Sequence, residues 1–124
     1  MNLLLDTHTL LWWLAGAPID PVASARIADP TNVVAVSAVS VWEIGIKRAL
    51  GKLEAPDALV THISDAGFEG LSVSLEHAER ASALPPHHRD PFDRMLVAQA
   101  QLERLAVVTR DRRFASYDVK TVAC

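Results

Sequence analysis

Apolar and polar residues follow one another in blocks along this chain, and the blocks predict strands and helices in turn. Three consecutive leucines at 3–5 predict a buried strand over residues 2–5. The β-branched run at 33–37 is typical of a strand that is buried on both faces. Further short strands are predicted at 71–73, 105–109 and 119–123.

Apolar residues with helical spacing fill the segments between these strands. They predict helices over 7–15, 20–28, 39–50, 56–67, 74–84 and 90–103. Trp42 falls on the expected core face of the third helix, whereas the adjacent Trp12 and Trp13 cannot both face the core. The alternation predicts one α/β domain, residues 1–124, with a mainly parallel sheet. In such sheets the active site lies beyond the carboxyl ends of the strands.

The composition excludes several classes of protein. Half of the 124 residues are hydrophobic and 22% are charged, as in an ordinary globular domain. The net charge of −3 argues against a generally basic nucleic-acid binder, but not against a local basic patch. The single cysteine, Cys124, excludes an internal disulfide and a zinc site built on Cys pairs, and it fits a reducing cytoplasm. No apolar stretch approaches the ~20 residues needed to span a bilayer.

Three acidic residues are predicted at the same edge of the sheet. Asp6 directly follows the first strand, and Asp111 follows the strand at 105–109. Glu43 lies about one turn into the helix after the second strand. Asp93 lies at the start of a helix that follows a loop, and nothing local fixes the edge that it meets.

Each acid also has a purely structural explanation, since helix caps are common and worth ~0.5–2 kcal/mol. Glu43 fits a capping-box pattern with Ser40. Asp6 can cap the helix that follows it, and Asp111 can cap a turn. Asp90 fits an N-cap position, which leaves Asp93 in the first turn, where the helix dipole favours an acid.

Taken together, the acids favour a shared cation over separate caps. Crowded carboxylates cannot all ionise without a counter-charge. The available ligands are oxygens, with neither Cys pairs nor a His-x-x-x-His pair, which favours Mg²⁺ or Mn²⁺ over zinc. A divalent ion held by carboxylates is suited to the hydrolysis of phosphodiesters.

Four segments carry this pattern in order. They are Leu-Leu-Leu-Asp-Thr-His at 3–8, Ser-Ala-Val-Ser-Val-Trp-Glu-Ile at 37–44, His-Arg-Asp-Pro-Phe-Asp-Arg-Met-Leu-Val-Ala-Gln-Ala at 88–100 and Val-Val-Thr-Arg-Asp at 107–111. In this order and spacing they resemble the PIN domain family, and most closely the VapC-type toxins of toxin–antitoxin pairs. The resemblance implies a three-layer α/β/α domain with a mainly parallel central sheet of four to five strands.

The resemblance also implies an endoribonuclease that depends on Mg²⁺ or Mn²⁺. The family's four acids, expected to be both catalytic and metal-binding, fall on Asp6, Glu43, Asp93 and Asp111. Asp93 is preferred to Asp90 because the apolar residues after it match the family's helix. VapC-like proteins are usually homodimers inhibited by a small antitoxin, so the implied partners are RNA, an antitoxin and a second copy of the chain.

Neighbouring polar residues are candidates for supporting roles. Residues expected to hydrogen-bond a ligand carboxylate or water are Thr7, Ser40, Asp90 and Thr109, although helix capping explains Ser40 better. Candidates for RNA phosphate contacts are Arg94, Arg110, Arg112 and Arg113, with solvated or acid-paired arginines as the alternative. His87 and His88 lack metal-ligand spacing to another histidine, and a general-acid role for either is a minor alternative.

Three other functions remain open at this point. A PIN-type RNA-processing nuclease would share the chemistry without the toxin role, and an adjacent antitoxin gene would separate the two. A non-catalytic binding domain is disfavoured because all four acids are present. A phosphatase that works through a phospho-aspartate usually needs Asp-x-Asp, and His8 stands at the second position beyond Asp6.

Overall fold

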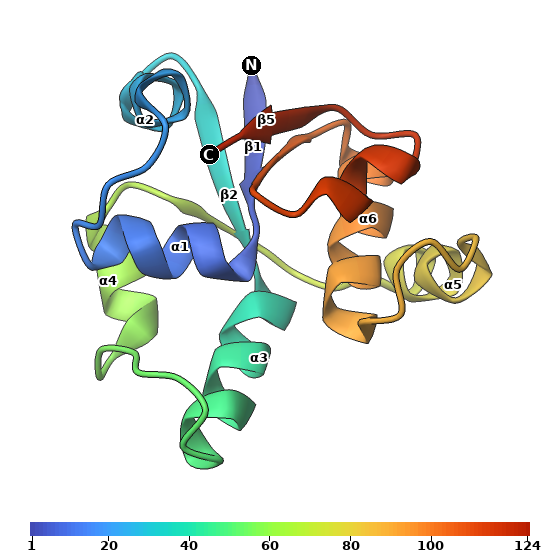
Figure 1. Ribbon diagram of the computed structural model, residues 1–124, viewed down its shortest axis with the longest axis horizontal. Coiled ribbons are helices and arrows are strands. Elements are labelled where there is room, and N and C mark those ends of the chain that lie inside the picture. Colours follow the sequence, from blue (N-terminus) through green and yellow to red (C-terminus); the bar gives the residue numbers. More distant parts are fainter.

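The computed structural model describes residues 1–124 as a five-stranded parallel sheet with helices on both faces (Figure 1). The strand order is β3-β2-β1-β4-β5. The strands are β1 (Asn2–Leu5), β2 (Val33–Ser37), β3 (Glu69–Leu71), β4 (Ala106–Thr109) and β5 (Thr121–Ala123). The predicted α/β class and parallel sheet are therefore confirmed.

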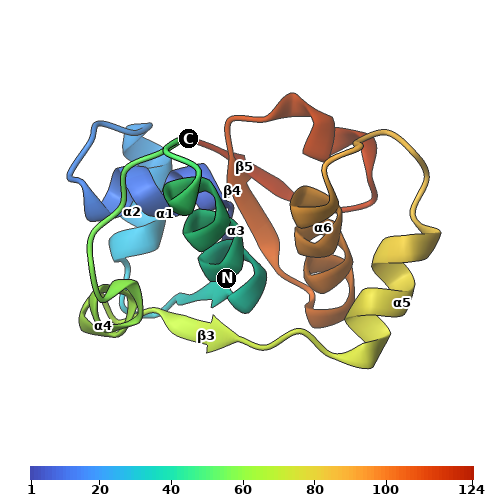
Figure 2. The ribbon, with the colours of Figure 1, turned by 90° about the horizontal axis from the view of Figure 1, so that it is seen from below.

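Two separate clusters of buried side chains, one on each face of the sheet, form the core. Leu3 and Leu5 of β1 join the cluster under α1 (Thr7–Leu14), α2 (Pro21–Ala28) and α4 (Leu59–Asp65), whereas Leu4 joins the cluster under α6 (Pro91–Glu103). Figure 2 shows α2 and α4 on one side of the sheet and α5 and α6 on the other. Since successive strand residues point to opposite faces, a strand covered on both sides must be apolar throughout. This explains the run of leucines.

Short helices connect the strands. They are α1 (Thr7–Leu14), α2 (Pro21–Ala28), α3 (Ala38–Ala49), α4 (Leu59–Asp65), α5 (Leu75–Ala83), α6 (Pro91–Glu103) and the 3₁₀ helix η1 (Arg112–Ser116). None of them is both long and apolar enough to cross a membrane. Side-chain caps begin α2 at Asp20, α5 at Ser74 and α6 at Asp90, as the sequence predicted.

Helix α3 projects from the carboxyl end of β2, beyond the edge of the sheet (Figure 1). It adds Ile44 to one core cluster and Val39 to the other. The prediction that Trp42 faces the core is wrong, because Ser40, Glu43 and Ile44 form the buried side of this part of α3. Trp42 is 64% exposed, and its ring lies 5.6 Å from that of Phe92 of α6 in a T-shaped contact.

Other differences from the sequence predictions concern where β3 and α4 begin and how Trp12 and Trp13 are buried. Strand β3 pairs with β2 through Glu69 and Gly70, so it lies earlier than the predicted 71–73. Helix α4 begins late, because Ala58 is in the left-handed conformation (φ 53°) and provides no side-chain cap. Trp12 and Trp13 are both half-buried against the first cluster, so neither is a fully buried core residue.

Candidate active site

The strand order brings the predicted acids to one edge of the sheet. Strands β2, β1 and β4 are neighbours, and Asp6, Asp111 and the helix that carries Glu43 follow their carboxyl ends. Asp93 approaches the same place from the first turn of α6, where the negative charges of the other acids act on it. The sequence alone gave no position for Asp93; only the family resemblance assigned it to this group.

Asp6 is both a helix cap and a member of the site. One carboxylate oxygen, Oδ1, accepts the backbone N–H of Thr9 at 2.8 Å, which caps α1. The other, Oδ2, accepts the hydroxyl of Thr109 at 2.5 Å. That hydroxyl in turn accepts the backbone N–H of Asp111 at 3.0 Å. Thr109 therefore links the ends of β1 and β4 and holds two of the acids relative to each other.

Glu43 is buried and has a partner on each oxygen. Its Oε1 accepts the hydroxyl of Thr7 at 2.6 Å, and that hydroxyl also lies 3.1 Å from Oγ of Ser40. Its Oε2 forms an ion pair with Lys47, and this bond raises the pKa of Lys47. The capping-box interpretation of Ser40 and Glu43 is wrong, because α3 begins earlier, with Ser37 as its N-cap.

A tight cluster of ligand atoms contains His88, for which the sequence predicted only a minor role. Nε2 of His88 lies 3.0 Å from Oδ2 of Asp93 and 3.0 Å from Oδ2 of Asp111. These three side-chain atoms lie within 4.8 Å of one another. His88 has no histidine partner at metal-ligand spacing, and Asp111 lies 23 residues away along the chain. No local signal could have revealed this contact.

The two aspartates of this cluster have opposite electrostatic environments. Burial, and then the charges of Asp90, Glu43, Asp6 and Asp111, raise the pKa of Asp93 to about 7. Burial also works to raise the pKa of Asp111, but hydrogen bonds from Arg113 and His88 outweigh it and lower that pKa to about 2. Asp93 is therefore the acid whose negative charge is least compensated by the protein.

Asp90 is the N-cap of α6. Its Oδ1 accepts the backbone N–H groups of Phe92 at 2.8 Å and Asp93 at 3.3 Å. This contact places the carboxyl group of Asp90 beside Asp93 and explains why it raises the pKa of that residue. The expected capping role and a supporting electrostatic role therefore coexist in one side chain.

The expected phosphate-binding arginines divide into separate groups. The guanidinium of Arg94 is engaged within the protein, where it donates to the backbone carbonyls of Ala81, Leu84, Pro85 and His88. Arg94 therefore holds the loop before α6 in place, and this arrangement favours the other three arginines for the predicted RNA contacts.

The other arginines lie close to the acids. Arg113 pairs with Asp111 at 2.9 Å, and Arg110 lies over the ring of Trp12 at 3.9 Å. Arg112 is exposed and forms no hydrogen bond or ion pair with another side chain. A hollow of about 460 Å³ beside the carboxyl ends of β4 and β5 is lined by Thr109, Arg110, Asp111 and Arg112, among others.

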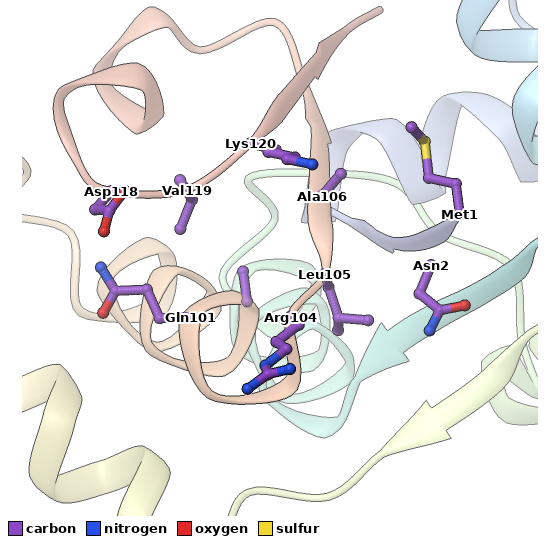
Figure 3. A pocket seen from close by; sticks show the side chains of 10 residues that line it. Met1, Asn2, Gln101, Arg104, Leu105, Ala106, Asp118, Val119 and Lys120 are labelled. Carbon is purple, nitrogen blue, oxygen red and sulfur yellow. The ribbon is translucent and has the colours of Figure 1, made fainter.

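A second hollow, of about 510 Å³, lies at the opposite edge of the sheet (Figure 3). Arg104, Leu105 and Lys120 line it together with Met1 and Asn2. It contains none of the clustered acids, histidines or threonines described above. The chemistry therefore concentrates at the carboxyl edge, where the acids meet.

A family model for the PIN domain matches residues 3–120. The chain belongs to the PIN domain family. It is similar to the Mycobacterium tuberculosis protein named Ribonuclease VapC22, with 29% identity over 94% of this chain and 92% of that protein. Thus the resemblance that the sequence segments suggested is confirmed, and it extends over nearly the whole chain.

Solved structures confirm the fold. VapBC2 from Rickettsia felis, bound to a DNA fragment from its promoter, matches 99% of this PIN domain and 98% of that chain with a TM-score of 0.74 and 14% identity. A toxin–antitoxin complex from Klebsiella pneumoniae matches 97% of this PIN domain and 95% of that chain, with a TM-score of 0.65 and 22% identity. At these identities the likeness establishes the three-layer architecture.

The raised pKa of Asp93 predicts a site that destabilises the metal-free protein. The folded state holds a proton on Asp93 up to about pH 7, whereas the unfolded chain releases it near pH 4. The free energy of unfolding therefore falls as the pH rises through this window and then levels off. Asp93→Asn should remove the penalty and stabilise the chelator-treated protein by about 1–3 kcal/mol at pH 8, with a much smaller gain at pH 4.5.

Urea unfolding at both pH values measures this difference. Asp118→Asn is the matched control, because Asp118 is exposed and lies at the opposite edge of the sheet. An equal gain for Asp93→Asn at both pH values would contradict the electrostatic explanation.

Proposed function

We propose that this PIN domain is a divalent-metal-dependent endoribonuclease and the toxin of a toxin–antitoxin pair. The observation that carries the proposal is the convergence of four acids at one sheet edge, with the pKa of Asp93 raised to about 7 by burial and by its neighbours. The similarity to a protein named as a VapC ribonuclease supports the nuclease activity. Complexes among the structural neighbours support an antitoxin partner.

The charges of the four acids fit a single divalent ion. Glu43 is paired with Lys47, and Asp111 with Arg113. Asp6 and Asp93 have no lysine or arginine partner, so about two negative charges remain uncompensated once Asp93 loses its proton. We propose that Asp6 and Asp93 hold Mg²⁺ or Mn²⁺, directly or through water, and that Glu43 and Asp111 complete the site.

The chain's own hydroxyl groups prepare these carboxylates. Thr109 donates to Oδ2 of Asp6, and Thr7 donates to Oε1 of Glu43. Both carboxylates are therefore oriented before a ligand binds. A bound Mg²⁺ or Mn²⁺ would supply an activated water and neutralise charge on the phosphate, so no side-chain nucleophile is needed.

RNA is proposed to enter from the side of β4 and β5. Arg110 and Arg112 line the hollow there, directly beside Asp111, and can bind phosphate oxygens next to the acids. Arg113 partly offsets the acidic field through its pair with Asp111. These local cations reconcile an RNA substrate with a net charge of −3.

Asp6→Asn tests the nuclease activity. Asparagine keeps the helix cap, so the fold should persist, but it removes a negative charge from the site. Cleavage of single-stranded RNA in Mn²⁺ or Mg²⁺ should fall at least about 100-fold, as should cleavage by the parent protein in excess chelator. Asp20→Asn is the matched control, since Asp20 caps α2 outside the site and its variant should cleave normally. Undiminished cleavage by Asp6→Asn or in chelator would rule out the metal mechanism.

The number of bound ions tests the charge assignment. Calorimetric titration with Mn²⁺ should give one ion per chain, because Lys47 and Arg113 already compensate two of the four acids. Lys47→Met should tighten Mn²⁺ binding severalfold, because it leaves Glu43 without its cation. Lys52→Met makes the same change at an exposed position and should have no effect. Two ions on the parent protein would overturn the assignment.

Expression in a bacterial host tests the toxin role. We propose a cytoplasmic homodimer whose production arrests growth, with relief by the small protein of a neighbouring gene. Asp93→Asn should abolish the arrest, since it removes a proposed metal ligand while keeping the first turn of α6 intact. RNA cleavage in vitro without growth arrest would favour the processing-nuclease alternative, and arrest that persists in Asp93→Asn would show that toxicity arises elsewhere.

A further inference from the structure

His88 is a buried polar side chain that the proposed reaction does not use. It is 3% exposed and lies in the loop between α5 and α6. Its ring meets Phe114 in a T-shaped contact with centroids 6.0 Å apart. Its backbone N–H donates to the hydroxyl of Tyr117 at 2.9 Å, and its carbonyl accepts from Arg94 at 3.3 Å. The ring is therefore held in one place by contacts from several elements.

The hydrogen bonds of the ring fix which nitrogen carries the proton. Nδ1 of His88 accepts the backbone N–H of Asp90 at 3.2 Å. A backbone N–H can only donate, so Nδ1 must present its lone pair. The proton of the neutral ring is therefore on Nε2, the atom that lies 3.0 Å from Oδ2 of both Asp93 and Asp111.

We infer that His88 is a positioning residue that shares its Nε2–H between Asp93 and Asp111, and that it is not itself a metal ligand. The inference rests on the proposed function in that it takes these two acids as parts of a metal site. A metal bound by Nε2 would need the lone pair of that atom. The proton would then have to move to Nδ1, where it would point at another donor, the N–H of Asp90.

In this role His88 extends a series of hydrogen bonds that links the acids of the site to one another. Asp93 belongs to α6 and Asp111 to the segment after β4, and His88 is the one side chain that contacts both carboxylates. Thr109 links Asp111 to Asp6 differently, because its hydroxyl donates to the carboxylate of Asp6 and accepts the backbone N–H of Asp111. The imidazole of His88 thus sets the distance between Asp93 and Asp111. Although His88, Asp93 and Asp111 each place a potential ligand atom there, only the two acids are inferred to serve the metal.

Variants of His88 separate a positioning role from ligation. The amide nitrogen of Gln approximates Nε2 and can still donate, whereas Leu removes the donor and keeps the bulk. His88→Leu should weaken Mn²⁺ binding by about 10–100-fold in calorimetry, and His88→Gln should stay within about threefold of the parent. His87→Leu is the matched control, since His87 is exposed and contacts neither acid.

Thermal unfolding checks that each variant is folded. If His88→Leu does not fold, His88→Asn takes its place with the same expectation, because its shorter amide does not reach the acids.

Electron spin-echo spectroscopy of the Mn²⁺-loaded protein gives a second readout that does not depend on cleavage. The parent should lack the ¹⁴N modulation of a coordinated imidazole, and His88→Leu should give the same spectrum. Imidazole modulation that disappears in His88→Leu would overturn the inference in favour of ligation. Unchanged Mn²⁺ affinity in His88→Leu would also overturn it. The two outcomes above would overturn only this inference and leave the proposed metal mechanism standing. Failure of the parent protein to bind Mn²⁺ would overturn both.

Discussion

Crowding of carboxylates at the carboxyl edge of the sheet is the constraint on which the rest of the site depends. Four acids of the site, together with Asp90, act on one another there, and burial reduces the screening that water would provide. The surrounding side chains respond to this charge. Lys47 and Arg113 each neutralise one acid, and α6 adds the positive end of its dipole near Asp93. What remains uncompensated is the charge that a divalent ion would balance.

Hydrogen-bond donors turn this crowding into a defined geometry. Thr7, Thr109 and His88 each hold a carboxylate oxygen that would otherwise be free to rotate or separate. A site held in this way is preorganised for a ligand. It lowers the stability of the metal-free protein, because like charges are kept close together. The same arrangement therefore explains the raised pKa of Asp93 and would serve the proposed binding of a divalent ion.

Local capping and site chemistry proved to be compatible in the same residues. Asp6 caps α1 with one oxygen and meets Thr109 with the other, and Asp111 caps η1 while it faces His88. A carboxylate has about four lone-pair positions, so a cap uses only part of its capacity. The structural explanation that the sequence offered for each acid was thus correct for some residues without excluding the shared site.

The sequence by itself determined the layered architecture and most of the acids at the edge. A leucine run at β1 and a β-branched run at β2 require cover on both faces, and parallel strands bring Asp6, Glu43 and Asp111 to one end. Only the tertiary structure decided the rest. Asp93, His88 and the exposed Trp42 depend on how α6 and its preceding loop dock, and Arg94 secures that loop by binding four backbone carbonyls. Docking depends on contacts between residues far apart in the chain, and local patterns carry no information about those contacts.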